Sequence, residues 1–364
     1  MPLESPLLDQ HRSAGAEVGE YFGTLLPSRF ADFAAEYSAA RNTVALADTN
    51  FRAYFAFSGP DAQRYLNAVL TSNVRDLQPG QGTVGLLLTP QGHILAEIET
   101  FARNGSILAA SHAMVRERTF STFDKFIIMD DVTLEDVTPA MGNLDLLGPR
   151  AAALVSDVSG VNLVDMPVLS HREGTIGSIP CRIVHHKFAI HPAARIIVDR
   201  ERLAPLWREI EAKARALGGT PAGMEALNSI RLESGTPWFG CDYDDKNIPH
   251  EAGLEHSHIS YEKGCYTGQE IVERVRSRGH VNRRLTLLKF PAANPPAPGT
   301  KLFAAGNAAD VGYITSAAVS PLLQRPIGLG YLRREHSAPG TRLDASGMEA
   351  EVISPPLFAN PAAT

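Results

Sequence analysis

The sequence predicts an α+β fold that ends in a small all-β module. Helix-like and strand-like stretches alternate without the regular β-α-β rhythm of a parallel sheet. The Gln91-Gly92 step joins two strand-like runs at a turn, which makes their pairing antiparallel. The stretch 291–299 is rich in prolines, which lack amide donors, and only short apolar runs follow it. These three observations favour mixed, mainly antiparallel structure followed by strands alone.

Helices and strands are both expected before residue 290. Phe30, Phe33 and Tyr37 recur at helical spacing, and a turn at 59–61 leads into a second amphipathic helix. The further helices predicted from apolar spacing are 112–125, 149–155, 203–217 and 224–233. The further strands predicted in this part are 132–137, 177–184 and 195–198.

The hairpin around Gly92 is expected to consist of strands 83–89 and 93–101. Side chains alternate between the two faces of a strand, so Ile94, Ala96 and Ile98 share one face. Glu97 and Glu99 then share the other face.

The all-β module is expected to open with the strand 284–290. Its remaining strands follow from short apolar runs bounded by Gly and Pro, at 301–304, 310–319, 326–333, 341–345 and 348–353.

Composition is that of an ordinary globular protein. The 364 residues are enough for two or three domains, with 44% hydrophobic and 20% charged residues. No apolar run approaches the roughly 18–20 residues needed to cross a bilayer, and the N-terminus lacks a signal-peptide pattern. We therefore expect a cytoplasmic protein without membrane partners. A net charge of −6 disfavours nucleic acid as a partner.

The three cysteines show no pairing pattern and cannot supply a four-thiolate metal site. One of them, Cys265, lies two residues after Lys263 and just before a helix expected to begin at Gly268. A nearby ammonium and a helix N-terminus both favour the thiolate, so this pattern indicates a reactive cysteine. The alternative is that Cys265 is a small buried apolar residue.

An arginine-rich strip follows this cysteine, with guanidiniums at 274, 276, 278, 283 and 284. On a strand, the first three would share one face that could bind carboxylates or phosphates, whereas on a helix they would be scattered. A solvated charged face is the alternative. His256 and His258 lack partners at metal-site spacing, so no metal site is predicted.

The segment 263–270, KGCYTGQE, resembles the signature of the YgfZ-type folate-binding proteins, which belong to the superfamily of the glycine-cleavage T-protein. Further segments that resemble this superfamily lie at 5–17, 59–74, 231–254 and 278–285. The resemblance implies a ring of three subdomains around a central folate channel. Residues 1–282 would form two interleaved, mainly antiparallel α+β subdomains, and 283–364 a C-terminal β-barrel.

The resemblance also implies roles for single residues. Cys265 and Lys263 match the signature thiol and lysine, and Tyr266 and Gln269 of the same signature would contact the cofactor, a tetrahydrofolate or a one-carbon derivative of it. Arg231 matches the position that lines the folate channel and would pair with a folate carboxylate.

The acidic position near the folate nitrogens departs from the T-protein pattern. The T-protein has paired aspartates after its Gly-Gly turn, where this chain has Ala96 and Glu97, so Glu97 is the candidate acid. The T-protein's YTGE element, whose glutamate holds the pterin, has no clear counterpart, because Lys187 and the residues after it occupy that region.

Two functions follow from the resemblance. The first is a tetrahydrofolate-binding accessory protein that supports iron–sulfur cluster assembly or repair in client proteins through Cys265. The alternative is a folate-dependent aminomethyltransferase or demethylase in which Glu97 is the general acid or base. Whether the chain is an enzyme stays open at this point. A third hypothesis, an RNA-modification partner, would use the strip 274–284, and the net charge disfavours it.

Overall fold

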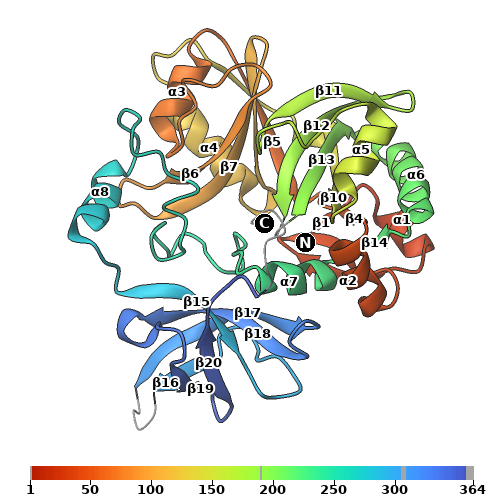
Figure 1. Ribbon diagram of the computed structural model, residues 1–364. Helices are drawn as coiled ribbons and strands as arrows, with labels where there is room; N and C mark the ends of the chain where they lie inside the picture. Colours follow the sequence, from red (N-terminus) through yellow and green to blue (C-terminus); the bar gives the residue numbers. More distant parts are fainter. Residues whose placement is uncertain (1, 189–190, 305–308, 358–364) are drawn as a thin grey trace. The chain divides into compact units, whose positions relative to one another are not determined.

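The computed structural model describes residues 2–188, 191–304 and 309–357 (Figure 1). These residues fall into two compact units. The first unit comprises Met1–Leu87, Ala96–Leu227 and His258–Thr267, and the second comprises Leu88–Leu95, Asn228–Ser257 and Gly268–Thr364. The predicted division into 1–282 and 283–364 stays a prediction.

The first unit contains a five-stranded sheet with the strand order β6-β7-β8-β5-β9. Its strands are β5 (Arg52–Ser58), β6 (Gly82–Leu88), β7 (Ile94–Arg103), β8 (Ser106–His112) and β9 (Thr133–Asp136). Its helices are α3 (Ala62–Val69), the 3-10 turn η1 (Ala113–Val115) and α4 (Arg116–Phe126). The predicted helix 112–125 begins later than expected, because His112 still pairs with Arg52 in the β8–β5 ladder.

A six-stranded sheet of the same unit has the order β11-β12-β13-β10-β4-β14. Its strands are β4 (Ala45–Asp48), β10 (Met141–Leu147), β11 (His171–Ile176), β12 (Ile179–Phe188), β13 (His191–Asp199) and β14 (Thr220–Pro221). Its helices are α2 (Phe33–Asn42), η2 (Thr138–Ala140), α5 (Ala151–Ser159) and α6 (Arg200–Ala216). The N-terminal segment adds α1 (Leu8–Ser13) and a small sheet of β1 (Leu3–Glu4), β3 (Thr24–Arg29) and β2 (Glu17–Tyr21).

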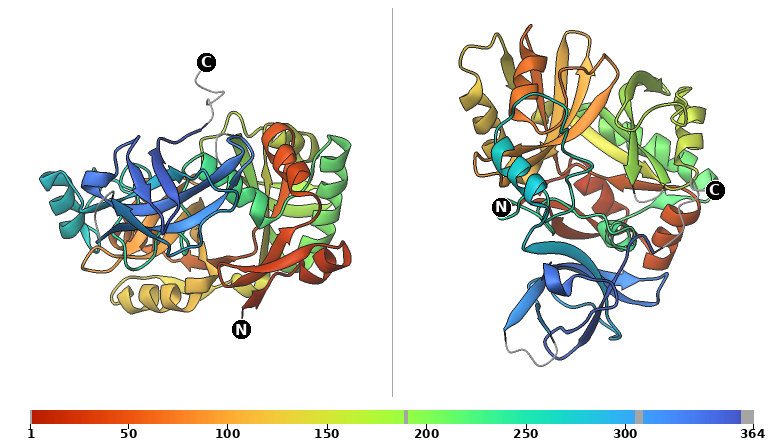
Figure 2. Two further views of the ribbon diagram at one scale, coloured as in Figure 1. Left: turned by 90° about the horizontal axis from the view of Figure 1, so that it is seen from below. Right: turned by 60° about the vertical axis from the view of Figure 1, so that its left-hand side comes forward.

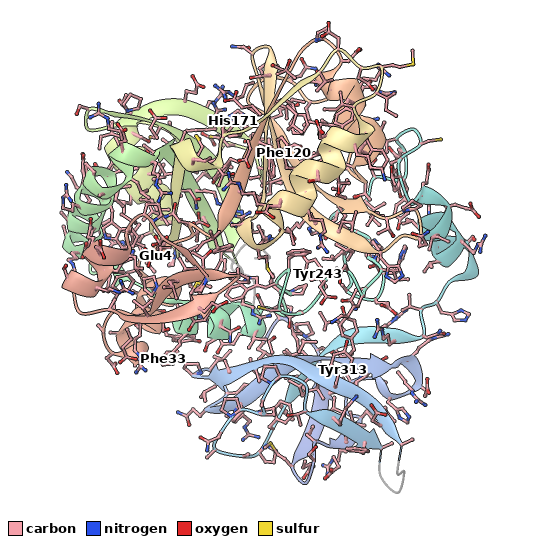
Figure 3. The ribbon with its side chains drawn as sticks, turned by 180° about the vertical axis from the view of Figure 1, so that it is seen from behind. Glu4, Phe33, Phe120, His171, Tyr243 and Tyr313 are labelled. Atoms are coloured by element: carbon pink, nitrogen blue, oxygen red, sulfur yellow. The ribbon has the colours of Figure 1, made fainter. Side chains whose placement is uncertain are left out.

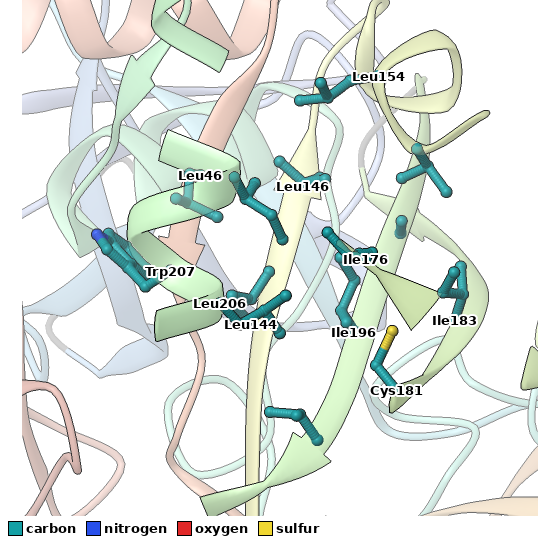
Figure 4. Packing of buried hydrophobic residues seen from close by; sticks show 14 of the residues in the cluster. Leu46, Leu144, Leu146, Leu154, Ile176, Cys181, Ile183, Ile196, Leu206 and Trp207 are labelled. Atoms are coloured by element: carbon teal, nitrogen blue, oxygen red, sulfur yellow. The ribbon is translucent and has the colours of Figure 1, made fainter. Parts of the chain in front are cut away.

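Helices α5 and α6 cover one face of the six-stranded sheet. Trp207 and Leu206 of α6 pack against Leu144 and Ile196 of the central strands β10 and β13 (Figure 4). Strand side chains alternate, so the neighbours of these residues, such as Ile197, point to the opposite face. There Ile197 joins an apolar cluster with Tyr54 of β5, which brings the two large sheets of the unit face to face.

The second unit contains a closed six-stranded barrel with the order β15-β18-β17-β16-β19-β20 (Figure 2). Its strands are β15 (Arg283–Lys289), β16 (Lys301–Ala304), β17 (Asp310–Ser320), β18 (Arg325–Arg333), β19 (Arg342–Asp344) and β20 (Glu349–Ile353), with the turn η3 (Arg334–His336). Helix α7 (Met224–Glu233) begins in the first unit, and α8 (Gln269–Arg278) precedes the barrel. All six barrel strands predicted from the sequence are present, and the α+β class is confirmed.

Candidate functional site

A buried ionic network joins the facing sheets of the first unit. Arg195 of β13 donates from Nε and one terminal nitrogen to the two carboxylate oxygens of Asp145 on β10, at 3.0 and 3.1 Å. Its other terminal nitrogen donates to Glu99 of β7. Arg52 of β5 approaches the same Glu99 oxygen at 3.4 Å. Two guanidiniums therefore balance two carboxylates in a region that is almost closed to solvent.

The network keeps its carboxylates ionised. Burial raises the pKa of Glu99 and of Asp145, but the guanidiniums of Arg195 and Arg52 outweigh it, so both pKa values lie below their usual range. Burial, together with the charge of Arg195, lowers the pKa of the neighbouring His186 to about 4. Glu99 and Asp145 therefore stay ionised at neutral pH, and the imidazole of His186 beside them is neutral.

Glu97 lies two residues before Glu99 on the same face of β7, as alternation predicts, whereas Ile94 and Ala96 are buried on the other face. An oxygen of Glu97 lies 3.3 Å from Nε2 of His258, and the two side chains are only 18% and 12% exposed. The structure thus places Glu97 in a half-buried acid–imidazole pair. No sequence pattern predicts this contact, because 161 residues separate Glu97 from His258.

The segment that carries His258 is anchored to the first unit by its backbone. The Thr71 hydroxyl donates to the carbonyl of His258 at 2.6 Å, and the amide of Ser260 donates to the carbonyl of Thr71 at 2.9 Å. On the other side of the pair, the Ser111 hydroxyl donates to the carbonyl of Glu97 at 2.9 Å. The main chains on both sides of the pair are therefore held in place.

Lys263 is bonded to the end of helix α3. Its ammonium is buried, donates to the carbonyls of Asn67 and Leu70, and lies 4.9 Å from the centre of the Tyr266 ring. These carbonyls stand at the C-terminal end of α3, where a cation is favourable. Burial lowers the pKa of Lys263 to about 8. The ammonium is therefore directed at the end of a helix, and the role expected for it beside the thiol of Cys265 stays a prediction.

The signature residues after Lys263 have different environments. Cys265 is exposed and Tyr266 is buried, both in the first unit. Gln269 is half-buried and is the first residue of α8, which follows Gly268 as predicted. Burial raises the pKa of Cys181 to about 11, and burial together with the charge of Asp242 does the same for Cys241. At neutral pH those two thiols are poor nucleophiles.

Arg231 has several partners inside the second unit. It is 1% exposed and donates to Asn228 at 2.8 Å, to Ser316 at 2.7 Å and to the carboxylate of Asp242. Its guanidinium lies 4.7 Å from the ring centre of Trp238. These contacts tie α7 to the barrel strand β17 within the second unit. Protein groups take up most of the guanidinium, and the expected pairing of Arg231 with a folate carboxylate stays a prediction.

The first three arginines of the arginine-rich strip lie on helix α8, and Arg283 and Arg284 lie on strand β15. On α8, Arg274 pairs with Glu270 at 2.7 Å, and Arg276 approaches Glu273 at 3.6 Å. Arg283 of β15 pairs with Glu251 at 2.9 Å. These three guanidiniums are therefore paired with carboxylates. Because residues 274–278 are helical, Arg274, Arg276 and Arg278 do not share the face that a strand would give them. The RNA hypothesis stays a prediction that the net charge of −6 disfavours.

Residues 2–188, 191–304 and 309–357 contain no group of three or more His, Cys, Asp or Glu residues arranged to hold a metal ion. Within the same ranges, no helix is long and apolar enough to cross a membrane.

Comparisons with known proteins agree with this architecture. Residues 7–260 match the family model of the GCVT N-terminal domain, and residues 283–358 match that of the glycine cleavage T-protein C-terminal barrel domain. The chain therefore belongs to the glycine cleavage T-protein family. This confirms the superfamily part of the predicted resemblance, and the finer YgfZ-type assignment stays a proposal.

Relatives resemble the chain over nearly its whole length. An aminomethyltransferase of Moorella thermoacetica is 26% identical over 363 residues, covering 98% of both chains. One of Rubrobacter xylanophilus is 27% identical and covers 91% of this chain and 87% of its own. The crystal structure of the glycine cleavage system aminomethyltransferase T from Bartonella henselae superposes with a TM-score of 0.88 at 21% identity, covering 98% of both chains. That likeness confirms the fold.

Sequence reasoning missed the network around Arg195. A weak signal was present, because an arginine and an aspartate interrupt the strand-like runs ARIIV and NLDLL. A charge inside a buried strand requires a partner, and this alone could have led to a search for one.

Proposed function

We propose that this protein is a folate-dependent one-carbon transferase of the aminomethyltransferase type, the alternative that the sequence left open. The relatives that match the chain over nearly its full length are aminomethyltransferases. The observation that carries the proposal is the half-buried pair of Glu97 and His258 beside a network of fixed charge. Such a carboxylate suits proton transfer to and from an amine.

Tetrahydrofolate is the proposed cofactor, and the donor set of the first unit fits it in one respect. Glu97 offers carboxylate oxygens that can accept hydrogen bonds from the N–H groups of a pterin, because its side chain is still 18% exposed. Glu99 does not fit this role, since two guanidiniums already engage it. When bound, the cofactor would supply the nitrogen that accepts the one-carbon unit.

The residues of the chain would transfer the proton and supply fixed charges around the site. Glu97 would hold a proton for the departing amine, and His258, 3.3 Å away, would orient the carboxylate and share that proton. The network of Arg195, Glu99 and Asp145 would keep the wall behind Glu97 rigid, because its charges are paired and buried.

The test is a single-turnover assay of one-carbon transfer from an aminomethyl or N-methyl donor to tetrahydrofolate. Glu97→Gln should lower the rate about 10²–10⁴-fold, because it removes the proton-transferring group but keeps its size. The matched control is Glu117→Gln on the exposed surface of α4, which should keep the wild-type rate. An unchanged rate in Glu97→Gln would refute the assignment of the acid.

The accessory function remains a second candidate because Cys265 is exposed, whereas Cys181 is buried and the pKa values of Cys181 and of the exposed Cys241 are raised to about 11. We expect iodoacetamide at pH 7 to alkylate Cys265 first, since the raised pKa values suppress the thiolates of the other two. Mass spectrometry of the labelled peptides measures this order. Equal, slow labelling of all three would remove the support for this candidate.

Comparing Cys265→Ser with Glu97→Gln separates the two candidate functions. Cys265→Ser should leave the transfer rate intact if the protein is a transferase, whereas it should abolish support of iron–sulfur clients if the protein is an accessory factor. Glu97→Gln should do the reverse. A loss of transfer rate in Cys265→Ser would contradict the roles assigned here.

A further inference from the structure

Three titratable side chains form one row across neighbouring strands of the five-stranded sheet. The ladder between β5 and β8 pairs Arg52 with His112. The ladder between β7 and β8 pairs Glu99 with Ala110, and two residues further in the same antiparallel register Glu97 comes opposite His112. Because β8 lies between β7 and β5, His112 lies between Glu97 and Arg52.

This row belongs to the inner face of the sheet. Side chains alternate along β5, so Phe55 and Arg52 point to opposite faces. Helix α4 covers the face of Phe55, whose ring centre is 6.3 Å from that of Phe120, a residue that Figure 3 labels. Tyr54, on the same face as Arg52, shares an apolar cluster with Ile197 of the facing sheet. The row therefore faces the buried ionic network between the two large sheets.

The imidazole of His112 is held in this row by aromatic rings. The residue is 5% exposed, and its ring centre lies 5.5 Å from that of Phe51 and 5.6 Å from that of Phe22. Burial, together with the charge of Arg52, lowers the pKa of His112 to about 4, while the charge of Glu97 acts in the opposite direction. At neutral pH a neutral ring therefore separates a carboxylate from a guanidinium.

The guanidinium of Arg52 takes the longer of two paths to a carboxylate. Glu97 lies in the same row two strands away, which is about 10 Å between backbones at the usual strand spacing. Glu99 lies two residues further along β7, which makes the diagonal path about 12 Å. Arg52 nevertheless reaches Glu99, at 3.4 Å. The methyl group of Ala110 leaves the diagonal path open, whereas the imidazole of His112 occupies the direct one.

The choice of Glu99 over Glu97 has a chemical consequence. A guanidinium in contact with a carboxylate stabilises the ionised form and makes the carboxylate a poor carrier of protons. Burial raises the pKa of Glu99, but Arg195 and Arg52 outweigh it and keep that carboxylate ionised. Glu97 is paired with the imidazole of His258 instead. Two carboxylates on one face of β7 thus have different electrostatic environments.

We infer that His112 is a positioning residue, whose ring keeps the guanidinium of Arg52 on Glu99 and away from Glu97, so that Glu97 can gain and lose a proton. The inference rests on the proposed function for the use of that proton, whereas the separation of the charges can be measured without any transfer. The other titratable groups around the row are Glu99 of β7, Asp145 of β10, His186 of β12, Arg195 of β13 and His258.

The test follows the titration of the Glu97 carboxyl by NMR in protein labelled with carbon-13 in its glutamate side chains, with Glu97→Gln to assign the signal. His112→Ala opens the direct path, so the midpoint of this titration should move to lower pH by about one unit or more as Arg52 reaches Glu97. His112→Gln keeps a neutral side chain in the path and should keep the wild-type midpoint. Adding Arg52→Gln to His112→Ala removes the guanidinium and should restore the wild-type midpoint.

An unchanged midpoint in His112→Ala, or a lowered midpoint that persists after Arg52→Gln is added, would overturn the assignment. If His112→Ala does not fold, Arg52→Gln by itself still decides the question. With the imidazole in place, this variant should leave the midpoint nearly unchanged. A rise of about one unit would show that the guanidinium already acts on Glu97 and that His112 does not separate them.

The pH profile of the single-turnover transfer rate distinguishes this inference from the proposed function. If Glu97 carries the proton, the profile of His112→Ala should move to lower pH together with the NMR midpoint. A midpoint that moves while the profile stays in place would support the separating role of His112 and contradict Glu97 as the acid of the transfer.

Discussion

Arg195 lies inside the apolar strand β13 with 1% of its side chain exposed, so its charge requires partners on the facing sheet. Asp145 and Glu99 supply them from β10 and β7. The cluster is close to neutral, and it fixes which faces of the two sheets meet. Single residues thus connect the packing of the unit to the electrostatics around Glu97.

The buried histidines around this network predict a dependence of stability on pH. Burial, together with the charges of Arg52 and Arg195, lowers the pKa values of His112 and His186 to about 4. Unfolding returns them to about 6.5, so between those values the unfolded state binds more protons and stability falls as pH falls. Glu99 and Asp145, whose pKa values are lowered, act in the same direction below about pH 4.

We therefore expect the free energy of unfolding to decrease from pH 7 to pH 5 by about 2 kcal/mol for each of the two histidines. Urea titrations at both pH values measure this. His186→Gln should reduce the difference, while His256→Gln, whose side chain is 90% exposed, should not. A free energy that does not change with pH would contradict the buried neutral state of His186.

At the scale of elements, the segment that bears the cysteine signature caps the C-terminal end of α3, a helix nearly 200 residues earlier in the chain. Lys263 donates to the carbonyls of Asn67 and Leu70, which the last turn of α3 leaves without helical partners. The lysine of the signature thus attaches Cys265 and its neighbours to α3. This contact accounts for the lysine without any chemistry at the thiol.

Lys263→Met should destabilise the C-terminal end of α3, because the substitution leaves two carbonyls without their buried donor, at a cost of about 1–3 kcal/mol. Amide hydrogen exchange of α3 should become faster in the variant. Lys125→Met, at an exposed position of α4, is the matched control and should leave this exchange unchanged. Wild-type protection of α3 in Lys263→Met would show that the contact does not stabilise the helix.

At the scale of the whole molecule, two family models cover 7–260 and 283–358 and the fold matches that of an aminomethyltransferase. Within the second unit, Arg231 holds α7 to the barrel through Asp242 and Ser316. Arg231→Ala should lower the free energy of unfolding by about 3–5 kcal/mol, because the carboxylate of Asp242 remains buried without its charge partner. Urea unfolding measures the loss.

The same variant distinguishes a structural residue from a folate contact. In protein that is still folded, the affinity of Arg231→Ala for tetrahydrofolate should equal that of the wild type. Arg284→Ala, at an exposed position of β15, is the control for stability and should behave as wild type. Selective loss of folate affinity with unchanged stability would restore the role first expected for Arg231.

The sequence by itself determined the α+β class, the six barrel strands, α7 over Met224–Glu233 and the family, because these depend on local patterns and contiguous motifs. Only the tertiary structure decided what the charged residues do. Glu97 and His258 are 161 residues apart, and Arg195 is 96 residues from Glu99. Periodicity shows which face of a strand a side chain occupies, but its partner comes from the packing of distant elements. For the same reason Lys263 and Arg231 carry structural roles that no motif could reveal.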